Sequence, residues 1–252
     1  MVMPWLATFL GSVFGLKISL KSQKRQGLLL GFAAGIMLAA SVWSLIIPAF
    51  DEAGNGVTGA IVSTIGFLIG CLGMLLLDKL MPHQHMDDSP PEGMKSTFSK
   101  PMLLVMAVAL HNIPEGVALG IVITAMQNNT MSWNAALAFA LGLALQNFPE
   151  GMAVVLPMRE AGFNYEKSRK WGILATFAEP VSAILGLIAA SVLSNLGWII
   201  MPILLSTAAG AMIFIVVEEL IPESQFAHDG HSATYGILIG FWVMAVMGIV
   251  CS

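Results

Sequence analysis

Two long apolar stretches carry the same polar insertion, and they decide the fold. Residues 101–126 read PMLLVMAVALHNIPEGVALGIVITAM, and residues 132–158 read SWNAALAFALGLALQNFPEGMAVVLPM. A membrane-spanning helix needs about 20 predominantly apolar residues, and both stretches are longer than that. The shared insertion is His111-Asn-Ile-Pro-Glu-Gly116 in the first and Gln146-Asn-Phe-Pro-Glu-Gly151 in the second. The pair predicts two neighbouring membrane helices that present polar side chains to a common point.

The composition of the whole chain also indicates a membrane protein. The 252 residues are 57% hydrophobic and only 10% charged, whereas soluble domains carry about 25% charged residues. We expect an all-α, polytopic membrane helical bundle that forms a single domain over 1–252, without a nucleic-acid-binding patch. Eight transmembrane helices are predicted from the apolar runs at 4–20, 27–49, 57–80, 101–126, 132–158, 171–195, 197–221 and 233–251.

The basic residues orient these spans. All 11 Lys and Arg residues lie in or beside the odd-numbered connections between spans. Basic loops face the cytoplasm in membrane proteins, so we expect both termini to be extracytoplasmic in a cell membrane (plasma or inner). The connection at 81–100 is then cytoplasmic, and its Pro, Gly, Ser and Lys content is typical of a flexible loop.

The chain contains two pairs of similar sequence segments. The first is the motif pair itself, and the second links Ala33-Ala-Gly-Ile-Met37, before Pro48, with Ala208-Ala-Gly-Ala-Met212, before Pro222. In each pair one member runs outward and the other inward. Inverted repeats of this kind are typical of transporters, whose sites lie near the membrane midplane.

Acidic residues inside the predicted spans are the candidate functional groups. No intramembrane Lys or Arg neutralises them, so protons or a bound cation must do so. His111 and Glu115 are four residues apart and share one helix face, and Gln146 and Glu150 repeat that spacing. Pro114 and its counterpart in the second motif are expected to kink these helices. The ligands offered at this point are His111, Asn112, Glu115, Gln146, Asn147 and Glu150.

This ligand set has a metal preference. Imidazole with carboxylate and amide oxygens suits zinc, and also iron, manganese, cobalt or cadmium. HNIPEG and QNFPEG on consecutive membrane helices resemble the ZIP family of metal transporters, most closely its bacterial GufA-type branch. The resemblance implies the ZIP fold, with Zn²⁺ as transported substrate and no organic cofactor. It also implies import toward the cytoplasm by an elevator-type alternating-access motion, and a homodimer.

The resemblance assigns further residues. Glu179 would join the six motif residues in lining a two-metal transport site, and Glu218 and Glu219 would form a cytoplasmic exit. Many family members have His or Asp where this chain has Gln146 and Asn147, which leaves the second metal position with less negative charge. Residues considered for auxiliary metal contact are Met37 on the second span and His83 and His85 in the loop.

Other interpretations stay open at this point. Gln146 and Asn147 would also serve as hydrogen-bonding contacts between helices, Glu179 as a protonated structural acid, and Glu218–Glu219 as an interfacial pair. A proton-coupled organic-solute carrier would use the acids as relays. An intramembrane zinc protease would need H-E-x-x-H, whereas the chain has H-N-x-x-E, so we do not expect an enzyme.

Overall fold

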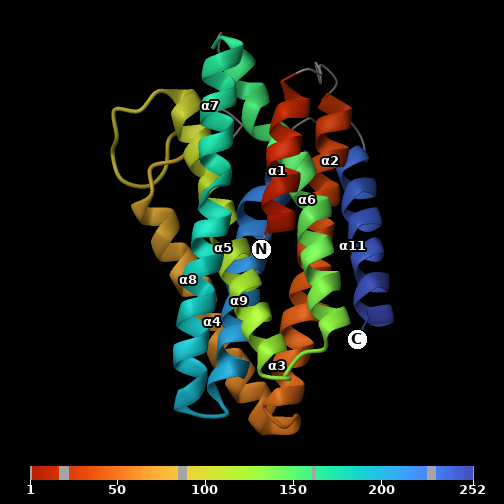
Figure 1. Ribbon diagram of the computed structural model, residues 1–252. Helices are drawn as coiled ribbons and strands as arrows, with labels where there is room; N and C mark the ends of the chain where they lie inside the picture. The colour runs from red at the N-terminus through yellow and green to blue at the C-terminus, as the bar shows by residue number, and fades with distance from the viewer. Residues whose placement is uncertain (1, 17–22, 85–89, 161–162, 226–230, 252) are drawn as a thin grey trace.

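Helices form nearly all of the structure. The computed structural model describes residues 2–16, 23–84, 90–160, 163–225 and 231–251 (Figure 1). Its elements are α1 (Val2–Gly15), α2 (Gln23–Ala40), η1 (Ser41–Ile46), α3 (Ile47–Glu52), α4 (Gly56–Leu80), α5 (Lys100–Gln127), α6 (Trp133–Glu160), α7 (Tyr165–Thr176), α8 (Ala178–Leu193), η2 (Ser194–Leu196), α9 (Ile200–Ile215), η3 (Val216–Leu220), α10 (Ile221–Gln225) and α11 (Ser232–Cys251). Across these residues they line up as eight helical rods, because α2–η1–α3, α7–α8–η2 and α9–η3–α10 each continue one another.

The rods agree with the predicted spans in number and order. Within the described residues, six are long and apolar enough to cross a membrane: 24–52, 56–80, 105–127, 165–196, 200–225 and 232–251. The first rod differs from its prediction. It begins at Val2 and ends at Gly15, and the predicted residues 17–20 lie outside the described part. Figure 1 shows α1 beside only the upper part of α6.

The outer helices expose apolar side chains, as expected for lipid contact. In the most apolar windows of α4 and α11 only 28% of residues are buried, against 67% in those of the α2 rod and of α5. On α4, Leu68, Leu72 and Leu76 point outward and are more than half exposed. The polar motif residues lie inside instead, so the chain is an all-α, multi-pass membrane protein.

The helices associate as four close pairs: α1 with α6, α5 with α8, α2 with α11, and α4 with α9. The first two pairs contact each other through α5 and α6, and we call α1, α5, α6, α7 and α8 the site-bearing group. The other two pairs meet along η1 and α9. We call the rods built from α2 to α4 and from α9 to α11 the framework group.

Glycines set the spacing inside these pairs. A Cβ at Gly70 of α4 would lie 2.0 Å from the carbonyl oxygen of Thr207 on α9, and one at Gly35 of α2 would lie 2.1 Å from that of Ile237 on α11. A Cβ at Gly151 of α6 would meet the carbonyl of Thr8 on α1 at 2.1 Å. Only a residue without Cβ permits such backbone contact between membrane helices. Gly116 likewise packs against Glu179 and Ser182 of α8, not against α6.

Two π-helical turns interrupt the second and seventh rods. Both α5 and α6 run as single helices through Pro114 and Pro149. The π-helical turns η1 and η3 instead come just before Pro48 and Pro222. A proline clashes with the carbonyl four residues earlier, and a local π turn relieves that clash. The α7–α8 rod breaks at Phe177, directly before Glu179 and Pro180.

Candidate metal site

The two motifs meet between α5 and α6. The side-chain amide of Gln146 donates a hydrogen bond from Nε2 to Oε1 of Glu115 at 2.5 Å, and a longer one to Oδ1 of Asn147 at 3.3 Å. None of the three side chains is exposed. The predicted convergence of the two helices is therefore present at Glu115 and Gln146, and the amide nitrogen makes the contact.

The third helix of the site is α8. Nδ2 of Asn147 on α6 donates to Oε2 of Glu179 on α8 at 2.8 Å. Glu179 is in the first turn of α8, directly after the break at Phe177. An acidic side chain in the first turn of a helix is favoured by the helix dipole. Glu115, Gln146, Asn147 and Glu179 thus form one hydrogen-bonded chain through three helices.

His111 makes its contact in a different direction. Its Nε2 forms a hydrogen bond with Oε2 of Glu219 on η3, and both side chains are buried. This contact joins the site-bearing group to the framework group. Glu219 is buried, whereas its neighbour Glu218 is exposed, and a role for the two acids at the cytoplasmic exit stays a prediction.

The buried acceptors that lack hydrogen bonds define the chemistry of the site. Among the described side chains, the atoms here without a hydrogen-bond partner are Oδ1 of Asn112, Oε2 of Glu115, Oε1 of Gln146, both carboxylate oxygens of Glu150, and Oε1 of Glu179. All six are oxygens. No Lys or Arg occurs among the buried polar side chains described. Buried oxygens of this kind require a donor or a cation, and a divalent metal ion suits them.

Two further predicted residues, Glu150 and Asn112, also offer buried oxygen atoms. Glu150 is 3% exposed and makes no hydrogen bond, so both its oxygens remain available. The amide nitrogen of Asn112 faces the carbonyl of Ala175 at 3.4 Å, which leaves its oxygen as the available atom. Ser182, which the sequence did not single out, donates to the carbonyls of Asn112 and Glu179 at 3.4 and 2.9 Å and holds α5 against α8.

The auxiliary residues lie apart from this cluster. Met37 is fully buried in the apolar core. His83 is buried beside Asp78 at the end of α4, while His85 lies outside the described residues. Nothing in the local sequence around His83 indicated that Asp78 and Glu92 lie near it.

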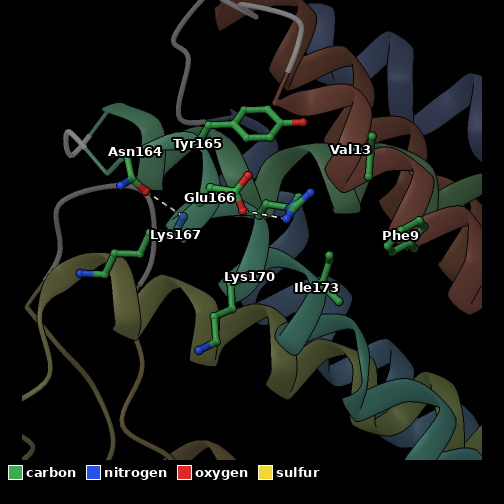
Figure 2. Close-up of a pocket in the computed structure, with 9 residues that line it drawn as sticks. Phe9, Val13, Asn164, Tyr165, Glu166, Lys167, Lys170 and Ile173 are labelled. Carbon is green, nitrogen blue, oxygen red and sulfur yellow. Dashed lines mark hydrogen bonds and ion pairs between the residues drawn. The ribbon is translucent and has the colours of Figure 1, made fainter.

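One open cavity lies apart from the polar cluster. It has a volume of about 710 Å³ and lies between α1 and the start of α7. Figure 2 shows Phe9 and Val13 of α1 on one side and Tyr165, Lys167 and Lys170 of α7 on the other. None of the predicted metal ligands lines this cavity.

Comparison with known proteins identifies the family. Residues 79–248 match the family described as ZIP Zinc transporter. The zinc transporter GufA of Myxococcus xanthus is 33% identical over 96% of this chain and 93% of its own length. The zinc transporter ZIPB of Bordetella bronchiseptica is 36% identical over 94% of this chain and 75% of its own. For human zinc transporter ZIP11 the identity is 28%, over 87% of this chain and 86% of its own. These matches confirm the resemblance seen in the two motifs: the chain belongs to the ZIP zinc transporter family, a family of transporters and not of enzymes.

Proposed function

We propose that this protein carries Zn²⁺ across the membrane through the cluster on α5, α6 and α8. The observation that carries the proposal is the set of six buried oxygens without hydrogen bonds, three of whose residues are carboxylic acids. Uncompensated acids inside a bilayer are costly, and a dication that binds them removes that cost. Iron, manganese, cobalt and cadmium share the same ligand preference.

Two metal positions are proposed within the cluster. The stronger position uses His111, Glu115 and Glu150, with Gln146 completing it. The neighbouring position uses Asn112, Asn147 and Glu179 and shares the carboxylates of Glu115 and Glu150. Because three carboxylates cannot neutralise two dications, we expect one position to fill well and the other only at high metal concentration or during passage.

The two amides have a second role in the metal-free state. The side-chain nitrogens of Gln146 and Asn147 donate hydrogen bonds to Glu115 and Glu179. These N–H groups occupy the place that a cation would take between the acids. An amide exposes nitrogen or oxygen after a half-turn of its terminal torsion. We propose that metal entry rotates each amide, so that its oxygen faces the metal while the carboxylates exchange N–H partners for the ion.

The arrangement of helices supports an elevator-type motion, in which the site-bearing group slides against the framework group. Inside each group, glycines bring backbones into contact, as at Gly120 against α8 and Gly70 against α9. Across the boundary, Gly142 of α6 faces the flexible side chain of Met244 on α11. Side-chain contacts rearrange more readily than interlocked backbones. Gly35 of α2 likewise packs on α11 inside the framework group.

The helix pairs also support inverted repeats over eight membrane spans in one domain, 1–252. In such a repeat the first three rods correspond in order to the last three, and α5 corresponds to α6. The pair α1–α6 is then equivalent to the pair α8–α5, and the pair α2–α11 is equivalent to the pair α9–α4. All four are the close pairs of the structure. The π turns of α2–α3 and α9–α10 then also correspond.

Orientation and assembly are part of the proposal. The uneven distribution of Lys and Arg supports extracytoplasmic termini and cytoplasmic basic loops in a cell membrane. Import toward the cytoplasm is proposed from membership in the family. A homodimer is proposed from membership in the family. In intact cells, single cysteines at 51–56 or 127–131 should react with an impermeant reagent, and one at Lys95 should not. Reaction at Lys95 would reverse the assigned orientation.

Metal uptake into proteoliposomes tests the transport proposal. Purified protein should accumulate Zn²⁺ above protein-free vesicles, and competition by Mn²⁺, Fe²⁺, Co²⁺ and Cd²⁺ would rank the other substrates. Mg²⁺ serves as a control cation, since it prefers oxygen ligands and retains its water. Uptake of an organic solute with no response to metals would support a proton-coupled carrier instead.

A further inference from the structure

The cavity between α1 and the start of α7 has no part in the transport proposed above (Figure 2). Its volume of about 710 Å³ falls within the range of roughly 300–1,000 Å³ that is usual for small-ligand sites. Basic side chains of α7 line one part of the cavity, and apolar side chains of both helices line another. This combination restricts the kind of molecule that fits it.

The polar part of the cavity is basic. Lys167, Arg169 and Lys170 of α7 line it, and we call these three residues the basic rim. Among the described lining residues Glu166 is the one acid, and its carboxylate accepts a hydrogen bond from Arg169 at 2.7 Å. The ammonium of Lys167 lies 4.3 Å from the centre of the Phe163 ring. Three positive charges against one negative charge favour an anionic ligand.

The apolar part of the cavity extends to the lipid-facing surface. Phe9 and Val13 are four residues apart and share one face of α1, and Ile173 of α7 completes this part of the lining. The ring centre of Trp5 lies 6.1 Å from that of Phe9 and 5.6 Å from that of Phe177. We call Phe9, Trp5 and Phe177 the aromatic strip. Phe177 is 46% exposed, so the strip leads from the cavity to the outer surface of the helices and offers a path for an acyl chain.

A membrane lipid combines the two properties that the cavity selects. The start of α7 follows the basic connection at 159–170, which the proposed orientation places at the cytoplasmic surface. Acidic lipids make that surface of a membrane negative, and basic pockets between membrane helices bind their headgroups. A soluble phosphate compound would leave the aromatic strip unused. We propose that an anionic glycerophospholipid binds between α1 and α7, with its phosphate at the basic rim and an acyl chain along the aromatic strip.

The lipid would complete the contact between these two helices. Near the start of α1 they touch directly, because the indole N–H of Trp5 donates to Oγ1 of Thr176 at 3.1 Å. Toward the end of α1, beside Phe9 and Val13, the cavity separates them. A lipid that fills this space adds contacts available only in the folded protein, so its binding should also raise thermal stability.

Lipid binding to the purified full-length chain in detergent tests the proposal. The probe is dioctanoyl-phosphatidylglycerol, whose binding is counted by native mass spectrometry and whose effect on the unfolding midpoint is measured in parallel. Dioctanoyl-phosphatidylcholine, which has no net charge, and glycerol phosphate, which has no acyl chain, should both bind at least several-fold more weakly. Equal binding of phosphatidylcholine would overturn the role of the basic rim. Equal binding of glycerol phosphate would make the ligand a soluble phosphate compound and overturn the lipid assignment.

The basic rim is tested by removing two of its charges. Lys167→Gln/Lys170→Gln should weaken phosphatidylglycerol binding by roughly tenfold or more, because each basic residue near an acidic lipid surface contributes on the order of fivefold. Lys79→Gln/Lys95→Gln removes the same charge at exposed lysines outside the cavity and should leave binding unchanged. An equal loss in the two double variants would show attraction to the whole basic surface and would overturn the site.

The apolar part is tested by filling it. Val13→Trp places a large ring in the cavity and should weaken phosphatidylglycerol binding several-fold. Leu10→Trp, at an exposed position of α1 that does not line the cavity, is the matched control and should bind normally. Unchanged binding in folded Val13→Trp protein would overturn the proposal, and the lysine variants decide it if Val13→Trp does not fold. None of these measurements involves uptake, so failure of the transport proposal and failure of the lipid site are separate results.

Discussion

The site-bearing group and the framework group are assembled alike but carry different chemistry. Each consists of two helix pairs in which glycines bring backbones into contact. The site-bearing group holds Glu115, Glu150 and Glu179 in its interior, whereas Glu219 is the framework acid that reaches them, through His111. The difference teaches that the candidate ligands Glu115, Glu150 and Glu179 all lie on helices of one group, which is the arrangement that the proposed elevator-type motion requires.

The largest effect should come from removing a shared carboxylate of the site-bearing group. Glu115→Ala should reduce Zn²⁺ uptake to the level of empty vesicles, because both metal positions lose a ligand and a negative charge. The protein should still fold and insert, since the apolar packing is unchanged. Glu166→Ala, at an exposed acid on α7, is the control. Uptake at the normal rate by folded Glu115→Ala protein would remove the transport role from this cluster. His111→Ala should show the same loss.

The next effect concerns the packing within a group. Gly70→Ala places a methyl group against the carbonyl of Thr207, and overpacking of this kind costs about 1–3 kcal/mol. We expect a lower thermal unfolding midpoint in detergent. Gly73→Ala, one turn further along α4, meets no neighbouring atom within 4 Å and should leave the midpoint unchanged. Equal midpoints for the two variants would contradict the backbone contact between α4 and α9.

A glycine at the boundary sharpens this comparison. Gly142→Ala would place its methyl group 2.4 Å from Sδ of Met244, the end of a flexible side chain that can move aside. We expect a smaller loss of stability than for Gly70→Ala, together with slower zinc uptake. A loss of stability as large as that of Gly70→Ala would show that the two groups are interlocked there, and would argue against sliding.

A smaller change is expected at the neutral amides of the site. Asn147→Asp adds a carboxylate beside Glu179 and should tighten the second metal position by roughly tenfold, or about 1.4 kcal/mol. Release should slow, because transport requires sites weak enough to let the ion leave. Equilibrium Zn²⁺ binding and uptake on the same preparation measure both effects. Two equal, tight sites in the unmodified chain would contradict the charge argument.

The smallest effect tests the contact between the two groups. Glu219→Gln replaces the charged partner of His111 and frees Nε2 for metal, so Zn²⁺ affinity at the stronger position should rise several-fold. Glu218→Gln, at the exposed neighbour on η3, is the control and should match the unmodified protein. Weaker binding in Glu219→Gln would make Glu219 a metal ligand itself and not a competitor for His111.

The sequence alone predicted much of the fold and of the cluster. Long apolar runs separated by basic or turn-forming loops form helices in lipid, because a helix pairs the backbone N–H and C=O groups within the same segment. The i, i+4 spacing of His111 and Glu115 fixed a shared helix face, so the meeting of Glu115 with Gln146 was predictable. The break near Gly197, which has φ +155°, was visible as a turn-forming residue between two apolar runs.

Other features required the tertiary structure. Glu218 and Glu219 are neighbours on η3, and only the packing of that turn against the other helices decides that Glu219 is the buried one. The partners of Gly116 and Gly151 depend on which helices lie behind the motifs. Likewise, Asp78, His83 and Glu92 meet only because a backbone bridge closes the loop. Local spacing determines which residues share a helix face, but contacts between distant segments depend on how all the helices pack together.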